Sequence, residues 1–428
     1  MKFIKNFSSK TFASLATRNY RLYFIGQAIS FTGTWMQTVA QGWLVLKLTG
    51  SGTALGIITA LQYLPILIFG PMGGVFADRY AKRKILYITQ SVSAILALIL
   101  GVLVLFNSIQ LWMVGVLALG LGLVNALDGP VRQTFVMEMV GKDQLANAVS
   151  LNAILMNVAR VLGPAIAGIV IAVTGLGLCF ILNSISFAAV IIVLFLMDAT
   201  KFHHLPLAEK SKGQLIEGLR YVNSNIILKN TILMMLIIGT LTYEFTISLP
   251  LFAQFALHGD ATTYSMLTAA MGLGSVVGGL VIASISHLKP QKLVSIAFFF
   301  GISVLAASFM PNIVSAMIAL VIVGFFSVTF TSLGNVTLQM ESVPQMRGRV
   351  MALWAVAFLG STPIGGPIVG WVGEQFGSRW GLIIGGLAAI FAAFIGRNFL
   401  KSYKTYTISE AVEMRAEQTP TEKNSRNI

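Results

Sequence analysis

Charged side chains are scarce in this sequence. Asp, Glu, Lys and Arg make up only 10% of the 428 residues, whereas soluble domains carry about 25%. Hydrophobic residues account for 56%. Because so few charges cannot cover a water-exposed surface, the composition predicts an integral membrane protein and excludes an ordinary soluble domain.

Chemically reactive groups are equally rare. The single cysteine, Cys179, lies inside an apolar segment, so no intrachain disulfide is possible and a small buried hydrophobic residue is indicated. The four histidines fall in loops or at the end of a span, and no motif typical of zinc proteases, serine hydrolases or Walker A ATPases occurs. We therefore expect no enzyme, no metal site and no cofactor.

Long apolar runs dominate instead. A helix needs about 20 apolar residues to cross the hydrocarbon core of a bilayer, and twelve stretches qualify. They are Leu22–Leu46, Leu55–Ala77, Ile85–Phe106, Leu111–Phe135, Ala148–Val173, Leu178–Met197, Ile226–Phe252, Tyr264–Ile285, Leu293–Met310, Ile313–Leu338, Val350–Val372 and Trp380–Leu400. The first is too long for a signal peptide, so we predict no cleaved leader. The sequence thus predicts an all-α membrane protein with twelve transmembrane helices.

The basic residues indicate the orientation of these helices. They outnumber the acidic residues 29 to 15, which in a soluble protein would suggest nucleic-acid binding. Here their placement argues for membrane topology, and we expect no nucleic-acid partner. With a cytoplasmic N-terminus, all but three bases lie on the cytoplasmic side, the exceptions being Lys47, Arg379 and the intramembrane Arg160. By the positive-inside rule, we predict a bacterial inner-membrane protein with both termini in the cytoplasm.

The second half of the sequence repeats the first at an offset of 203 residues. Arg132–Val140 aligns with Asn335–Val343, and Gly163–Pro164 falls on Gly366–Pro367. A parallel repeat of six spans predicts two pseudo-symmetric six-helix halves with the substrate between them. The predicted domains are an N-terminal half, 1–198; a cytoplasmic linker with an amphipathic helix, 199–225; a C-terminal half, 226–400; and a disordered cytoplasmic tail, 401–428.

A cluster of charge lies between the second and third predicted spans, in the order Gly74-x-x-x-Asp78-Arg79-x-x-Lys82-Arg83-Lys84. It resembles the loop signature of the major facilitator superfamily, G-x-x-x-D-R-x-G-R-R or K, with Ala81 in place of the last glycine. Less specific matches at Arg18–Phe24 and Asp128–Gln133 are similar to the drug and siderophore efflux branch, which contains enterobactin and macrolide exporters. The resemblance implies the major facilitator fold.

The resemblance also implies that Asp78 and Arg79 latch the halves together on the cytoplasmic side in the outward-open state. The predicted gate residues are Gly74, Asp78, Arg79, Lys82, Arg83, Asp128 and Arg132. A plain topogenic turn is the alternative for the loop, although topology alone does not require Asp78. Asp128 and Arg132 are four residues apart and flank Gly129–Pro130, so they form either a gate hinge or a local salt bridge at a kink.

Two acidic residues, Asp128 and Glu244, lie well inside predicted spans. Intramembrane ionisable residues are functional candidates by default, and proton coupling needs a carboxyl group that titrates. Glu244, Arg160 and Asp128 are therefore the predicted proton-coupling residues, with Glu244 and Arg160 paired across the cavity. Two alternatives stay open: Glu244 could be hydrated near the outer mouth, and Arg160 could bond backbone carbonyls of a neighbouring helix.

Polar residues recur at helical spacing along the first span, and such a stripe faces a cavity or another helix rather than lipid. In the superfamily, spans 1, 4, 7 and 10 line the cavity. The predicted cavity residues are Gln27, Ser30, Thr34, Gln37 and Gln41, with Tyr243 and Phe330 as apolar walls. Uncharged hydrogen-bonding groups beside aromatic rings suit an amphiphilic organic ligand.

Together these features predict a secondary active transporter that exports an amphiphilic small molecule, drug-like or siderophore-like, by proton antiport with alternating access. Its expected partners are the substrate, protons and the lipid bilayer, and the chain is expected to be monomeric. A proton-coupled importer of a small organic solute and a transport-dead membrane receptor stay open as alternatives, because transport direction is not written in a fold.

Overall fold

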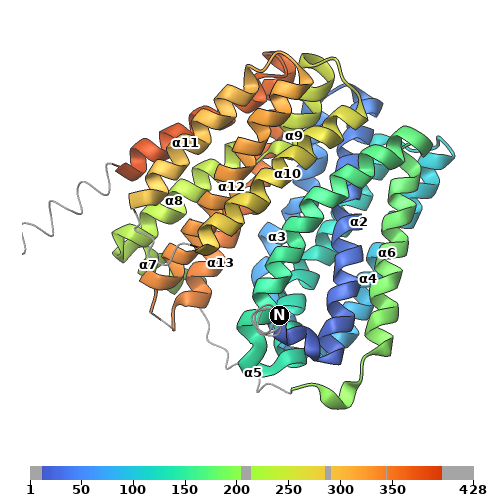
Figure 1. Cartoon of the computed structure of the whole chain (residues 1–428), viewed down its shortest axis with the longest axis vertical. Helices are drawn as coiled ribbons and strands as arrows, with labels where there is room; N and C mark the ends of the chain where they lie inside the picture. Colours follow the sequence, from blue (N-terminus) through green and yellow to red (C-terminus); the bar gives the residue numbers. More distant parts are fainter. Residues whose placement is uncertain (1–11, 204–213, 285–290, 344, 398–428) are drawn as a thin grey trace, which may run out of the picture.

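The computed structural model describes residues 12–203, 214–284, 291–343 and 345–397, without the side chains of 70–79, 214–215, 283–284 and 291. Within these ranges every regular element is a helix, as the sequence predicts. The structure has the predicted architecture of two six-helix halves (Figure 1). Cys179 is a free, buried cysteine, as expected.

The first half contains α2 (Arg18–Thr49), α3 (Gly52–Arg79), α4 (Lys82–Leu105), α5 (Leu111–Thr174) and α6 (Leu176–Leu196). The 64-residue α5 is about three times as long as the hydrocarbon core is thick. Gly141 has a φ of 70° inside it and divides it into two arms. Only glycine adopts this conformation routinely, so Gly141 lets one element cross the membrane twice.

The second half begins after a short linker helix, α7 (Gln214–Ser224). Its elements are α8 (Ile226–Leu241), α9 (Phe245–Leu251), the π-helix η3 (Phe252–Ala256), α10 (Ala261–Ser284), α11 (Gln291–Ser308), α12 (Ile313–Glu341), α13 (Arg347–Phe358), α14 (Thr362–Gln375) and a last helix, Trp380–Arg397. Glu217 of α7 pairs with Arg349 of α13 at 2.5 Å. The predicted amphipathic linker helix therefore packs on the second half.

Nine helical stretches of the described chain are long and apolar enough to cross a membrane. The bent α5 is one of them and supplies two crossings. The nine omit α2, whose polar stripe lowers its hydropathy, and α11, of which 17 residues, Lys292–Ser308, form a shorter apolar helix. Adding these two helices gives the twelve crossings of the prediction.

Two predicted spans are interrupted, contrary to the continuous helices expected. In the seventh, α8 ends at Leu241 and α9 begins at Phe245. In the eleventh, α13 ends at Phe358 and α14 begins at Thr362. Pro363 explains the second break, because proline lacks an N–H and its ring clashes with the carbonyl of the preceding turn.

Turns identify the two ends of the bundle. The Gly50 end carries Gly50, Asn107, Gly175, His258 and Gly377, all with positive φ. The Gly141 end carries the bend of α5 and the linker helix. In Figure 1 the two halves approach each other where α9 and α10 reach α2, and they diverge toward the lower ends of α5 and α13.

Glycines allow the halves to pack closely near the Gly50 end. A Cβ on Gly52 would lie 2.5 Å from the carbonyl oxygen of Gly370, and one on Gly56 would lie 2.4 Å from that of Gly366. Small residues let membrane helices approach backbone to backbone. The antiparallel α3 and α14 are therefore held in direct contact across the interface.

Candidate functional site

A cavity of about 360 Å³, the central cavity, lies on the inner face of the first half. Helices α2, α3, α4, α5 and α6 supply most of its wall, and Leu359, at the break between α13 and α14, contributes from the second half. Its polar lining residues are Thr34, Gln37, Thr38, Gln41, Gln62, Tyr63, Ser93, Asn125, Asp128, Arg132, Gln133, Asn152 and Asn183. The cavity wall therefore combines two charged side chains with many neutral polar ones.

The polar stripe of α2 reaches this cavity in part. Thr34, Gln37 and Gln41 line it. Asn183 donates to Gln37 Oε1 at 2.7 Å, and Gln41 Nε2 donates to Gln62 Oε1 at 2.9 Å. These bonds orient the two amides, because each glutamine is already fixed by a neighbouring helix.

Gln27 and Ser30, the other two members of the stripe, are buried between helices. Gln27 Oε1 accepts a hydrogen bond from Arg132. Neither residue lines the central cavity. Their contact with a substrate stays a prediction.

Asp128 and Arg132 form a buried ion pair in the cavity wall. Arg132 Nε donates to Asp128 Oδ2 at 2.7 Å. Thr89 Oγ1 and Gln90 Nε2 of α4 donate to the other carboxylate oxygen at 2.6 Å and 2.9 Å. The pair therefore ties α2, α4 and α5 together within one half.

The predicted local salt bridge is thus present. At Gly129–Pro130, where a hinge is the other prediction, the backbone keeps its helical geometry. The helix continues through Pro130, and its break in helical geometry lies at Gly141. A role of the ion pair in gating stays a prediction.

Glu244 lies in the break between α8 and α9 and is 1% exposed. Its carboxyl group lies near Thr362, at the start of α14. Its Oε1 has no hydrogen-bond partner among the described residues. The two interrupted spans of the second half therefore meet at this carboxyl group.

Arg160 does not pair with Glu244 within the described part of the chain. Its guanidinium lies 5.0 Å from the centre of the Trp35 ring, and its Nε is buried without a partner there. Tyr63 of α3 lies within electrostatic range of both Arg160 and Glu244. The predicted pair is therefore open in this conformation, with Tyr63 near both groups.

Tyr243 and Phe330 lie in the interior of the second half. Tyr243 donates to the Ser327 carbonyl at 2.7 Å and packs edge-on against Phe358, with ring centres 5.0 Å apart. Phe330 is fully buried in the apolar core. Neither is among the residues that line the cavity of the first half, so their role as cavity walls stays a prediction.

Two predicted gate residues make contacts within the first half. Lys82 Nζ lies 2.5 Å from Glu138 Oε1 of α5. Arg83 donates to the carbonyls of Leu194 and Phe195 at 2.9 Å and 3.3 Å. Arg83 thus satisfies carbonyl groups at the end of α6, where a cation also suits the helix dipole.

Gly74, Asp78 and Arg79 belong to the last part of α3. The surroundings of Gly74 and the side chains of Asp78 and Arg79 are outside what the structure describes. The predicted cytoplasmic latch therefore stays a prediction.

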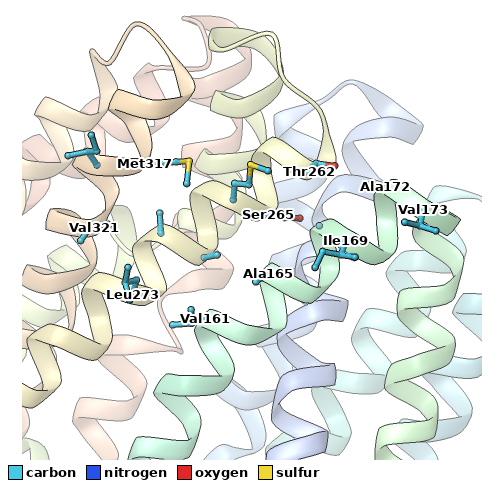
Figure 2. A pocket seen from close by; sticks show the side chains of 15 residues that line it. Val161, Ala165, Ile169, Ala172, Val173, Thr262, Ser265, Leu273, Met317 and Val321 are labelled. Carbon is cyan, nitrogen blue, oxygen red and sulfur yellow. The ribbon is translucent and has the colours of Figure 1, made fainter.

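An apolar groove of about 720 Å³ lies where α5 meets α10 and α12, near the Gly50 end. In Figure 2, Ala165 and Ile169 of α5 face α10, with Met317 and Val321 of α12 beyond it. Ser265 is one of the few polar residues there, and its hydroxyl donates to the Ala261 carbonyl of its own helix at 2.8 Å. The groove offers almost no hydrogen bonds, in contrast to the central cavity.

Three polar residues that bond the ion pair or join the two halves were not predicted from the sequence. Thr89 and Gln90 are buried in an apolar span, and their polarity there was the available signal. Glu374 bonds to the first half through Ser51 and Thr53. It sits at a span end, where an acid gives no sequence signal.

The fold and the polar cavity define a multi-pass membrane transporter of the major facilitator type. The chain is similar to the nucleoside transporter NupG, with a TM-score of 0.71 and 14% identity over 90% of this chain and 99% of that one. It is also similar to a bacterial homologue of the human lysosomal transporter Spinster in an inward-facing, unoccupied conformation, with a TM-score of 0.69, 14% identity and coverage of 90% and 97%. Identity this low shows the fold alone.

The chain belongs to the transmembrane secretion effector family, whose model matches residues 9–422. It is 25% identical over 371 residues to the staphyloferrin A transporter of Staphylococcus aureus, covering 83% of this chain and 90% of that protein. It is 23% identical to macrolide efflux protein A of Streptococcus pyogenes (87% and 95%) and 23% identical to the enterobactin exporter of Citrobacter koseri (86% and 90%). The protein is therefore an efflux-type transporter, as the sequence predicts.

Proposed function

We propose that this protein exports an amphiphilic small molecule, drug-like or siderophore-like, by proton antiport with alternating access. The observation that carries the proposal is the central cavity, which presents many neutral hydrogen-bonding groups beside Tyr23, Phe31 and Phe187. Such a wall suits a solute with both apolar and polar parts. The relatives named as siderophore and macrolide transporters support the same substrate class.

The position of the cavity indicates from which side a substrate can enter it in this conformation. The close glycine contacts between the halves lie near the Gly50 end. The cavity wall extends to Gln133 and Asn152, which flank Gly141 along α5. With the predicted orientation, the cavity faces the cytoplasm, where an exporter collects its substrate and an importer would release it, so the direction of transport is decided by the flux experiment below.

Among the three predicted proton-coupling residues, Glu244 fits the role best. Burying a carboxylate without a cationic partner is costly, so a proton is the partner that neutralises it most readily. Glu244 is almost fully buried and forms no ion pair within the described part of the chain. Asp128, by contrast, is already neutralised by Arg132.

Inverted membrane vesicles with an acidic interior test this proposal. The panel includes a macrolide, staphyloferrin A and enterobactin, with vesicles lacking the protein as the control. We expect accumulation inside that collapses when the pH gradient is dissipated. Loss of preloaded substrate from the vesicles would instead indicate an importer. Binding without any flux would indicate a receptor, and either outcome would overturn the proposal.

A further inference from the structure

At the Gly50 end, a carboxylate of the second half caps a helix of the first. Glu374 Oε2 accepts a hydrogen bond from Ser51 Oγ at 2.6 Å and another from the Thr53 amide at 2.9 Å. Helix α3 begins at Gly52, so Thr53 contributes one of its first amide groups. Ser51 Oγ itself accepts from the Ala54 amide at 3.1 Å. The Ser51 hydroxyl therefore links the first turn of α3 to the carboxylate of Glu374.

Such a cap has a physical basis. The first amides of a helix have no partners within the helix, and its N-terminus carries partial positive charge. An anion placed there makes charge-assisted hydrogen bonds. The cap usually comes from the residue just before the helix, whereas Glu374 lies on α14, across the interface.

Glu374 also continues the closest contact between the halves. Gly366, Gly370 and Glu374 are spaced by four residues and so share one face of α14. The two glycines contact Gly56 and Gly52 of α3 backbone to backbone. The cap therefore closes the end of a packed seam that must separate when the bundle opens at the Gly50 end.

We propose that Glu374 is the latch that holds the two halves closed at the Gly50 end. The inference rests on the alternating access proposed above and adds a residue that controls it. Opening at this end withdraws the carboxylate from α3 and leaves Ser51 and the Thr53 amide without their partner. The state that is closed at the Gly50 end is stabilised by this difference, because only an interaction that differs between two states shifts their equilibrium.

Distance measurements between spin labels test the latch without any substrate. Labels at Ser108→Cys and Phe309→Cys, in a Cys179→Ala background, report the separation of the halves at the Gly50 end. Both sites are exposed, one in each half. We expect Glu374→Gln to raise the ratio of the longer to the shorter distance by about 5- to 30-fold, the usual effect of losing a helix cap. Glu374→Asp, which keeps the charge on a shorter arm, should fall between this variant and the wild type.

Asp260→Asn is the matched control. Asp260 also caps a helix at the Gly50 end, but its Oδ1 accepts from the Thr263 amide at 2.9 Å within its own half. We expect this variant to keep the wild-type distances. Wild-type distances in Glu374→Gln would overturn the latch, as would an equal shift in Asp260→Asn. A wild-type protein without flux would overturn export and leave this distance result standing.

Discussion

Asp128 receives four hydrogen bonds on its two carboxylate oxygens, two of them from Arg132. A buried ion pair survives in a membrane protein because each member removes the charge cost of the other. Arg132 also lies over Phe31, with its guanidinium carbon 5.2 Å from the ring centre. At the scale of single residues, both carboxylate oxygens of Asp128 are thus satisfied.

Exchanging the two charges tests whether they act as a unit. We expect Asp128→Arg combined with Arg132→Asp to retain more transport than either single change. Each single change leaves two like charges in a buried site and costs about 3–5 kcal/mol, whereas the exchange restores the pair. Substrate flux per inserted molecule measures the effect. Equal losses in the singles and the double would exclude a functional pair.

Glu244 is the residue at which proton coupling is tested. We expect Glu244→Gln, which imitates the protonated carboxyl group, to keep exchange of substrate down its own gradient. Accumulation driven by an imposed pH gradient should fall to the level of empty vesicles. Asp260→Asn is the control, because Asp260 is an exposed acid at a distant turn. Unaltered gradient-driven accumulation in Glu244→Gln would assign the proton to another group.

At the scale of elements, the seam between α3 and α14 depends on the absence of side chains. We expect Gly56→Ala to destabilise the folded bundle by about 1–3 kcal/mol, because its Cβ would lie 2.4 Å from the Gly366 carbonyl oxygen. In the control, Gly348→Ala, the new Cβ meets nothing within 4 Å, so the effect should stay within about 0.5 kcal/mol. Thermal unfolding in detergent compares the two variants. Equal unfolding temperatures would mean that the seam can relax without cost.

The helices themselves could be predicted from the sequence, because long apolar runs mark the segments that cross a membrane. The two breaks within the seventh and eleventh spans were not predicted. Pro363 was a visible signal, but the gap before Phe245 follows no proline or glycine in Thr242–Glu244. There the chain is held by tertiary contacts, such as the bond from Thr242 Oγ1 to the Gly385 carbonyl at 2.7 Å.

The site was predictable to a similar degree. Polar residues in apolar spans pointed to Asp128, Arg132 and the stripe of α2, since a bilayer tolerates them only where they find partners. Which partner each of these polar residues contacts depends on how helices that are distant in sequence pack against each other. Gln27 bonds Arg132 rather than lining the cavity, and one sequence offers no way to tell these outcomes apart.

At the scale of the whole molecule, a latch is proposed at each end of α3. Its first residues meet Glu374, and its last turn carries the predicted latch residue Asp78. We expect Asp78→Asn to abolish transport while membrane insertion stays normal, because the loss concerns one conformation and not the fold. Flux and the amount of protein in the membrane fraction measure the two effects. Undiminished flux would mean that the charge cluster around Asp78 only sets the membrane topology.

The two interrupted spans make the two halves differ in the continuity of their helices. In the first half, α5 crosses twice with its one break in helical geometry at Gly141, in a turn outside the bilayer core. In the second half, the helical hydrogen-bond ladder fails twice within the bundle, next to Glu244 and at Gly360. Under the proposed proton coupling, the charge of Glu244 would change at one of these two breaks, where the backbone lacks a continuous helical hydrogen-bond ladder.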